Sequence, residues 1–149
     1  MERFYLNRSK KNAMLHNQSL NQFPFQTVCN TIIEIAMEVH RSLGKGFDDS
    51  SYKEAFSKML KLKGISFERE KKFGVNFYGV VLEQQFSADF VIEENIIVEV
   101  RSIPEKIEYN YVDVFKQLIV TKPKLGLTIN FYEELLRFKQ VALVDKYLS

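Results

Sequence analysis

The chain has 149 residues, of which 46% are hydrophobic and 27% are charged. This length and apolar content predict a single globular domain with a core of its own, and they exclude wholesale disorder. The only cysteine is Cys29, which excludes an intramolecular disulfide framework and any cysteine-based zinc site.

The net charge of +2 is unevenly distributed along the chain. Residues 1–23 contain four basic residues and one acidic residue, so this stretch carries +3 and the remainder carries −1. A nearly neutral body neither demands nor excludes a nucleic-acid partner. No apolar run reaches the roughly 18 residues that a membrane span needs, and polar residues interrupt any signal-peptide core. We therefore expect a cytoplasmic protein with no membrane partner.

The beginning of the chain differs in composition from the rest. Residues 1–26 are polar and rich in Asn and Gln, which we interpret as an N-terminal extension that precedes a domain over residues 27–149. From Val28 to Leu43 apolar residues recur at spacings of three and four, the period of a helix. A second helix is expected to begin near Ser51, because Ser51-Tyr52-Lys53-Glu54 has the form of a capping box.

The pattern after Gly64 is typical of β-strands, with a turn at Tyr78-Gly79. The predicted strands are residues 65–72, 73–77, 80–85, 86–92, 96–100, 125–129 and 140–144. Helical segments are predicted at residues 112–121 and 133–136. This order of elements predicts an α/β domain in which one mixed central sheet is flanked by helices.

Charged residues interrupt the two most apolar predicted strands at Asp89, Glu99 and Arg101. A three-residue loop at 93–95 places Asp89 directly opposite Glu99, with Cβ atoms about 4.5–5.5 Å apart. A two-residue turn instead puts them on opposite faces. Two carboxylates this close repel unless a cation lies between them, which favours a hard divalent cation such as Mg²⁺. The other interpretation is a structural ion-pair cluster with Arg101.

Several segments, in consistent order, resemble the GxxExxY protein family. The stretch Gly44–Tyr52 resembles the family signature, and Ser87–Val91 with Ile97–Arg101 resembles its "ADLLV…VIVELK" core. Lys116–Leu118 and Leu125–Phe131 resemble its "AQLLxYL" and "LGLLINF" segments. Together the matches span about residues 32–131, roughly two-thirds of the chain.

The GxxExxY family is assigned to the PD-(D/E)XK nuclease-like superfamily. The resemblance therefore implies a restriction-endonuclease-like core and a Mg²⁺-dependent phosphodiesterase that acts on DNA or RNA. It makes Asp89 the motif aspartate, Glu99 the second acidic metal ligand and Gln117 a helix glutamine near the site. Asp49 stands where the signature has glutamate, either as a further metal ligand or as a charge that stabilises a helix N-terminus.

Arg101 departs from the pattern, because the motif has lysine there. Lysine can shift its pKa, whereas arginine stays protonated and offers a planar fork. Arg101 either stabilises the scissile phosphate or locks the carboxylates and neutralises the metal site. Three functions stay open: a Mg²⁺-dependent nuclease, a catalytically inactive nuclease fold that binds nucleic acid or protein, and a homo-oligomeric domain whose former site serves stability.

A basic stretch supplies a candidate contact to a phosphate backbone. Residues 58–72 contain six basic and two acidic residues, a net of +4. The same stretch is also typical of a solvated helix face followed by an edge strand that lysines protect from aggregation.

Overall fold

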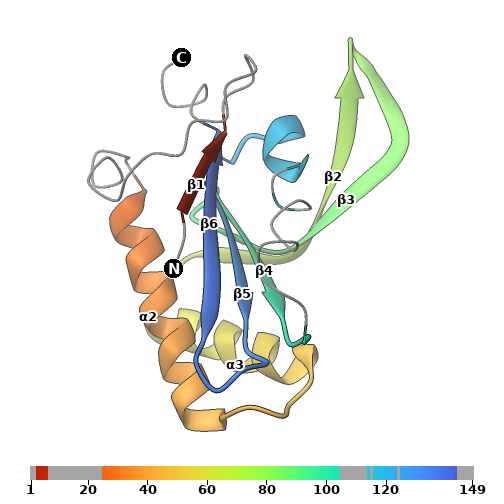
Figure 1. Ribbon diagram of the computed structural model, residues 1–149. Coiled ribbons are helices and arrows are strands. Elements are labelled where there is room, and N and C mark those ends of the chain that lie inside the picture. Colours follow the sequence, from red (N-terminus) through yellow and green to blue (C-terminus); the bar gives the residue numbers. More distant parts are fainter. Residues whose placement is uncertain (1–2, 7–24, 105–113, 115, 124, 144–149) are drawn as a thin grey trace.

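The computed structural model describes residues 3–6, 25–104, 114, 116–123 and 125–143 (Figure 1). Its strands are β1 (Arg3–Leu6), β2 (Phe67–Phe77), β3 (Val80–Ile92), β4 (Ile96–Arg101), β5 (Leu125–Asn130) and β6 (Arg137–Leu143). The two long helices are α2 (Gln26–Leu43) and α3 (Asp49–Leu62), and residues 114 and 116–120 are also helical.

All six strands belong to one sheet, in the order β1-β6-β5-β4-β3-β2. β1 is parallel to β6 and β4 is parallel to β5, whereas the other neighbouring pairs are antiparallel. The sheet is therefore mixed, as predicted, and it has helices on both faces. This confirms the predicted α/β class, a mixed central sheet flanked by helices.

The helices α2 and α3 cover one face of the sheet (Figure 1). Their apolar stripes recur at the helical period, so one side of each helix is buried against the strands. On α3, for example, Tyr52 stacks on Phe131 and Phe56 contacts Phe90 edge to face. This layer includes the largest fully buried side chains of the protein and forms the main core.

The helical residues 114 and 116–120 cover the opposite face. Val114 and Leu118 are buried there against Ile97 and Val141. Gly126 of β5 lets this segment approach closely, because a Cβ atom at that position would lie 2.0 Å from Cγ1 of Val114. The glycine therefore sets how near the segment comes to the sheet and to the polar residues beside it.

Several strand boundaries differ from the sequence prediction. The runs predicted at 65–72 and 73–77 form one strand, β2, and those at 80–85 and 86–92 form another, β3. The two strands pair continuously except for a register shift between Gly74 and Asn76, so the apparent break is an irregularity within one hairpin. The predicted turn at Tyr78-Gly79 is confirmed, and both residues have the positive φ that tight hairpin turns require.

The start of α3 also differs from the prediction. The capping residue is Asp48 and not Ser51, because the Asp48 carboxylate accepts hydrogen bonds from the backbone N–H and the hydroxyl of Ser51. These hydrogen bonds, the hydroxyl bond first, also lower the pKa of Asp48. The predicted capping box is therefore wrong, since the Asp48 side chain caps the first turn at the N–H of Ser51.

The C-terminal prediction needs two corrections. Residues 133–135 form bends and residue 136 has no regular structure, so the predicted helical turn is wrong, and β6 begins at Arg137, three residues before the predicted start at 140. The early start follows from pairing with β5, which reaches Asn130 opposite Arg137. Residues 112, 113, 115 and 144 of the predicted elements lie outside the described residues.

The polar N-terminal stretch contributes to the sheet. Its residues 3–6 form β1, which pairs in parallel with β6 from Arg3 opposite Gln140 to Leu6 opposite Leu143. No strand is predicted there from local sequence patterns, since this pairing joins residues more than a hundred positions apart. Among the described residues, no helix is long and apolar enough to cross a membrane.

Candidate functional site

The candidate site lies where β3 and β4 separate. Their register pairs Ile92 with Ile96 and Phe90 with Val98, so the loop between them has the three residues that the prediction requires. Beyond the Phe90–Val98 pair, the Asp89 side chain joins the two strands, because its Oδ2 accepts a hydrogen bond of 2.9 Å from the backbone N–H of Val100. Asp89 is thereby fixed beside the end of β4, next to Glu99.

Glu99 is a buried acid at the centre of this site, with 2% of its surface exposed. Its Oε1 accepts a hydrogen bond of 3.2 Å from Nε2 of Gln117, on the helical segment that covers this face. Its Oε2 lies 3.6 Å from a guanidinium nitrogen of Arg101. Glu99 and Arg101 are two residues apart on β4, so both project to the same face of the sheet.

Two cationic side chains flank the carboxylates. The Arg101 guanidinium spans both acids, since its other terminal nitrogen lies 3.7 Å from Oδ2 of Asp89. Lys53 of α3 reaches Asp89 from the other side, with Nζ 3.2 Å from Oδ1. Two acidic and two basic side chains therefore meet here, at the boundary between the helix layer and the sheet.

These cations leave the charge of Glu99 incompletely compensated. Burial, followed by the negative charge of Asp89, raises the pKa of Glu99 to about 8, against the lowering effects of Arg101 and the Gln117 hydrogen bond. The distances of 3.6 and 3.7 Å to Arg101 are longer than those of charge-assisted hydrogen bonds. At neutral pH Glu99 holds a proton that a closer or more highly charged cation would remove.

Asp49 does not contact the two carboxylates but hydrogen-bonds the backbone that follows β4. Its Oδ1 accepts a hydrogen bond of 2.8 Å from the backbone N–H of Ser102, directly after β4. The Ser102 hydroxyl in turn donates to the carbonyl oxygen of Phe47. The first turn of α3 is thus tied to the end of β4, which helps to hold Lys53, one helical turn after Asp49, against Asp89.

A family comparison identifies the fold that carries this arrangement. The model of the PD-(D/E)XK nuclease superfamily matches residues 26–141 of the chain. The chain belongs to the PD-(D/E)XK nuclease superfamily. Asp89 and the Glu99-Val100-Arg101 segment lie within the matched region, and the latter reads as (D/E)XK with arginine in the last position.

The comparisons with individual proteins are weaker. A solved structure described as "Crystal structure of SSO0001" is 16% identical over 78% of each chain, with a TM-score of 0.41. No curated protein matches the chain.

The oxygen atoms of this site are of the kind that hard divalent cations prefer. Asp89 and Glu99 supply carboxylates, and Oε1 of Gln117 is buried with no hydrogen-bond partner among the described residues, although its amide group faces Glu99. An unsatisfied buried oxygen beside an under-compensated carboxylate is what a cation or its water ligands would satisfy. The described residues contain no cluster of three His, Cys, Asp or Glu side chains, so Asp49 is not grouped with the other two acids.

Sequence reasoning missed Lys53, which comes from a helix 36 positions before Asp89. The available signal was its spacing of four from Asp49, which places both residues on one side of α3. Lys139 was missed as well. The strand register places Thr128 beside Glu99 and Lys139 beside Thr128, and both side chains are buried.

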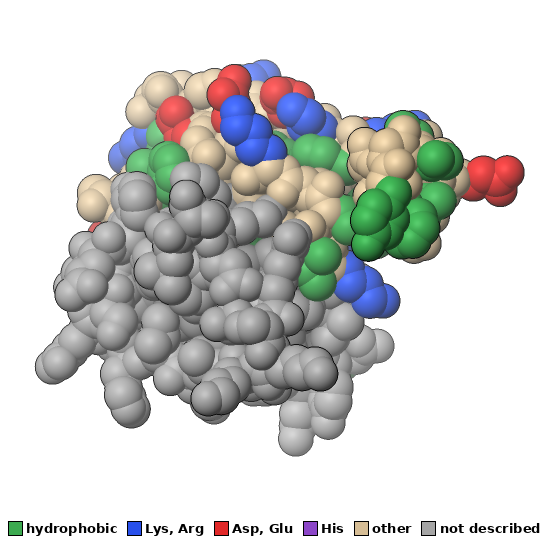
Figure 2. Space-filling view, turned by 90° about the horizontal axis from the view of Figure 1, so that it is seen from above, with side chains coloured by type: hydrophobic (Ala, Val, Ile, Leu, Met, Phe, Trp, Pro, Cys, Tyr) green, Lys and Arg blue, Asp and Glu red, His purple; other side chains and the backbone are tan. Residues whose placement is uncertain are grey.

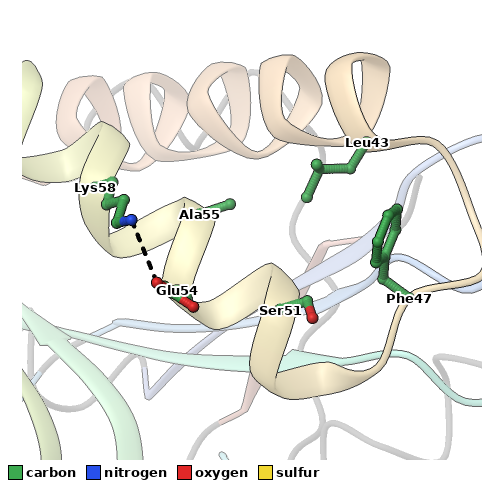
Figure 3. Close-up of a pocket in the computed structure, with 6 residues that line it drawn as sticks. All are labelled: Leu43, Phe47, Ser51, Glu54, Ala55 and Lys58. Carbon is green, nitrogen blue, oxygen red and sulfur yellow. Dashed lines mark ion pairs between the residues drawn. The ribbon is translucent and has the colours of Figure 1, made fainter.

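Other surface features do not belong to this site. A shallow pocket lies between the end of α2 and a different side of α3, where Lys58 forms an ion pair of 3.3 Å with Glu54 (Figure 3). Some basic residues of the predicted stretch at 58–72 have local contacts: Lys71 pairs with Glu68, and the Arg69 guanidinium lies over the ring of Phe90. Its positive charge is therefore partly compensated by the chain itself.

Proposed function

We propose that this protein is a Mg²⁺-dependent phosphodiesterase that cleaves DNA or RNA, with Asp89 and Glu99 as the metal ligands. The observation that carries the proposal is the buried Glu99, held beside Asp89 and kept under-compensated by its own surroundings. Membership of a nuclease superfamily supports the same reaction. We also propose that the chain lies within the GxxExxY branch, on the order and register of its motifs.

Each residue of the site has a separate task in this proposal. The Val100 N–H fixes the rotamer of Asp89, and the Gln117 amide fixes that of Glu99. Glu99 must lose its proton for both acids to bind a cation. A bound Mg²⁺ supplies an activated water and stabilises negative charge on the phosphodiester.

The two cations serve the substrate. Arg101 is 28% exposed at its side chain and makes only long ion pairs, so it is free to turn from the carboxylates towards a phosphate group. Lys53, with 20% of its side chain exposed, is available from the opposite side of Asp89. We propose that both contact the scissile phosphate, where fixed positive charge stabilises the developing negative charge.

The test is a cleavage assay on generic single- and double-stranded DNA and RNA, with Mg²⁺, Mn²⁺ or EDTA. We expect metal-dependent cleavage, at least a hundred-fold loss in Asp89→Asn, and no change in Glu38→Gln, which removes an exposed acid of α2. Melting temperature measured with and without Mg²⁺ gives a second readout, since a ligand that binds only the folded state raises it. If the wild type and Arg101→Lys neither cleave nor respond to metal, the proposal is wrong.

One observation favours a second candidate function, a catalytically inactive nuclease fold that binds nucleic acid. The Arg101 guanidinium already lies against both carboxylates, in the place where a cation would compensate them. In that case Arg101→Lys gains cleavage that the wild type lacks, and the wild type binds nucleic acid equally well in Mg²⁺ and in EDTA.

A further inference from the structure

The outer part of the β2–β3 hairpin projects beyond the body of the protein (Figure 1). We call residues 73–82 the arm; they include the end of β2, the Tyr78-Gly79 turn and the start of β3. Since β2 is the last strand of the sheet, its outer edge presents backbone N–H and C=O groups without a neighbouring strand among the described residues. Such an edge is a template for pairing with another chain.

The arm is both apolar and exposed. It contains no charged residue, in contrast to residues 68–72 directly before it, which are all charged. Its exposed apolar side chains, which gather at one end of the molecule in Figure 2, are Phe77 (58%), Tyr78 (93%), Val80 (62%), Val81 (68%) and Leu82 (40%). These exposed fractions amount to roughly 500 Å² of side-chain surface per copy. A patch of this size on a monomer is often functional.

The composition of the arm favours another β-strand as its partner over a nucleic acid. Binding to a phosphate backbone relies on Lys and Arg, and the arm has neither. An apolar strand edge instead suits another strand. Pairing along β2 would cover the backbone edges and the β2 side chains of both copies, an interface near the lower limit of specific ones.

The sequence of β2 is self-complementary in one register. An antiparallel pairing of two β2 strands centred on Val75 places Phe73 opposite Phe77 of the partner subunit and opposes no like charges. Pairings centred on Lys71 or Lys72 would place identical lysines face to face, which is destabilising. Aromatic cross-strand pairs add stability, and a two-fold axis makes both halves of such an interface identical.

We propose that the protein forms a two-fold symmetric dimer in which the arms of two copies pair antiparallel along β2, centred on Val75. The two sheets then continue through the interface. The partner subunit pairs with the outer edge of β2, whereas Asp89 and Glu99 lie on β3 and β4, further into the sheet. This association is independent of the proposed phosphodiesterase activity.

The first test measures the mass of the full chain by light scattering or analytical ultracentrifugation between about 10 and 100 µM. We expect twice the monomer mass of 17.5 kDa. The double variant Phe77→Lys/Val81→Lys should weaken association at least ten-fold, whereas Leu62→Lys, at an exposed leucine of α3, should not. A monomer throughout this range, or a dimer that survives the double variant, overturns the proposal.

The second test fixes the register and does not depend on weakened association. A two-fold axis at Val75 places two copies of that residue within disulfide distance. Val75→Cys should therefore form a covalent dimer under mild oxidation, while the fully buried Cys29 stays unreacted. Val80→Cys, an exposed arm position on β3, is the matched control. Equal cross-linking of both variants, or cross-linking of Val80→Cys alone, contradicts the proposed register.

Discussion

Replacing Glu99 by Gln should change how the stability of the protein depends on pH. Glutamine keeps the shape and the hydrogen-bonding capacity of the side chain and removes its ionisation. In the wild type, burial and the charge of Asp89 raise the pKa of Glu99 from 4.5 to about 8. Between these values the folded state holds a proton that the unfolded chain has lost, so raising the pH destabilises the fold.

The size of the effect follows from the width of that window. One pKa unit corresponds to about 1.4 kcal/mol, so the free energy of unfolding should fall by about 1.4 kcal/mol per pH unit within it. Because each state titrates gradually around its own pKa, the free energy of unfolding should fall by a total on the order of 3 kcal/mol between pH 5 and pH 8. Glu99→Gln lacks this loss, and its stability relative to the wild type should rise by the same amount. For a chain of this length the difference corresponds to about 10 °C in melting temperature.

Urea denaturation of both proteins at pH 5, 6, 7 and 8 measures the difference directly, and Glu38→Gln controls for the removal of an ordinary exposed acid. A wild-type–variant difference that stays constant over this range would refute the reasoning, because Glu99 would then titrate as an exposed carboxylate does. Saturating Mg²⁺ should flatten the wild-type curve, since a cation bound at the site displaces the proton. It should not change the curve of Glu99→Gln.

Two further predictions concern residues of β5, the strand that pairs with β4 beside the site. Asn130→Ala should lower the free energy of unfolding by about 2–3 kcal/mol in urea titrations, because the Asn130 amide hydrogen-bonds the N–H and the C=O of Ile103 and the N–H of Tyr132. The control Asn95→Ala loses one hydrogen bond in an exposed loop and should cost less than about 1 kcal/mol. Equal costs for the two variants would contradict the argument. Gly126→Ala should cost about 1–3 kcal/mol through the clash with Val114. Adding Val114→Ala to the Gly126→Ala chain should restore part of the lost stability. If Gly126→Ala alone does not lower the free energy of unfolding, the helical segment that contains Val114 moves away from the sheet without cost.

Local patterns in the sequence were enough to predict part of the candidate site. The three-residue loop between β3 and β4 follows from where apolar runs stop, and it sets the register that brings Asp89 towards Glu99. Periodicity likewise located α2, whose buried residues repeat every three or four positions. These features depend on neighbours in the chain, which is why spacing predicts them.

Features that depend on distant contacts were not predictable in this way. Lys53 has the spacing of an ordinary exposed helix residue, and only the packing of α3 against the sheet brings its ammonium to Asp89. The strand β1 exists through its pairing with β6. The Ser51 capping prediction failed for a local reason, since the helix already begins at Asp49 and the Asp48 carboxylate caps the N–H of Ser51.

The presence of Lys53 changes what the arginine in the motif means. Judged by position 101 alone, the chain has lost the lysine of its superfamily motif and with it a compact cation beside the metal ligands. The fold brings an ammonium to the same aspartate from α3, 3.2 Å from Oδ1, while Arg101 lies near Oδ2. Asp89 thus has a lysine on one side and an arginine on the other, and Glu99 remains the acid whose charge these cations compensate only in part. Arg101 is therefore an addition to the site's cations, and comparing Lys53→Met with Arg101→Met in the cleavage assay separates their contributions. A larger loss in Lys53→Met would assign the position of the motif lysine to α3, and an unchanged rate would leave Lys53 a purely structural partner of Asp89.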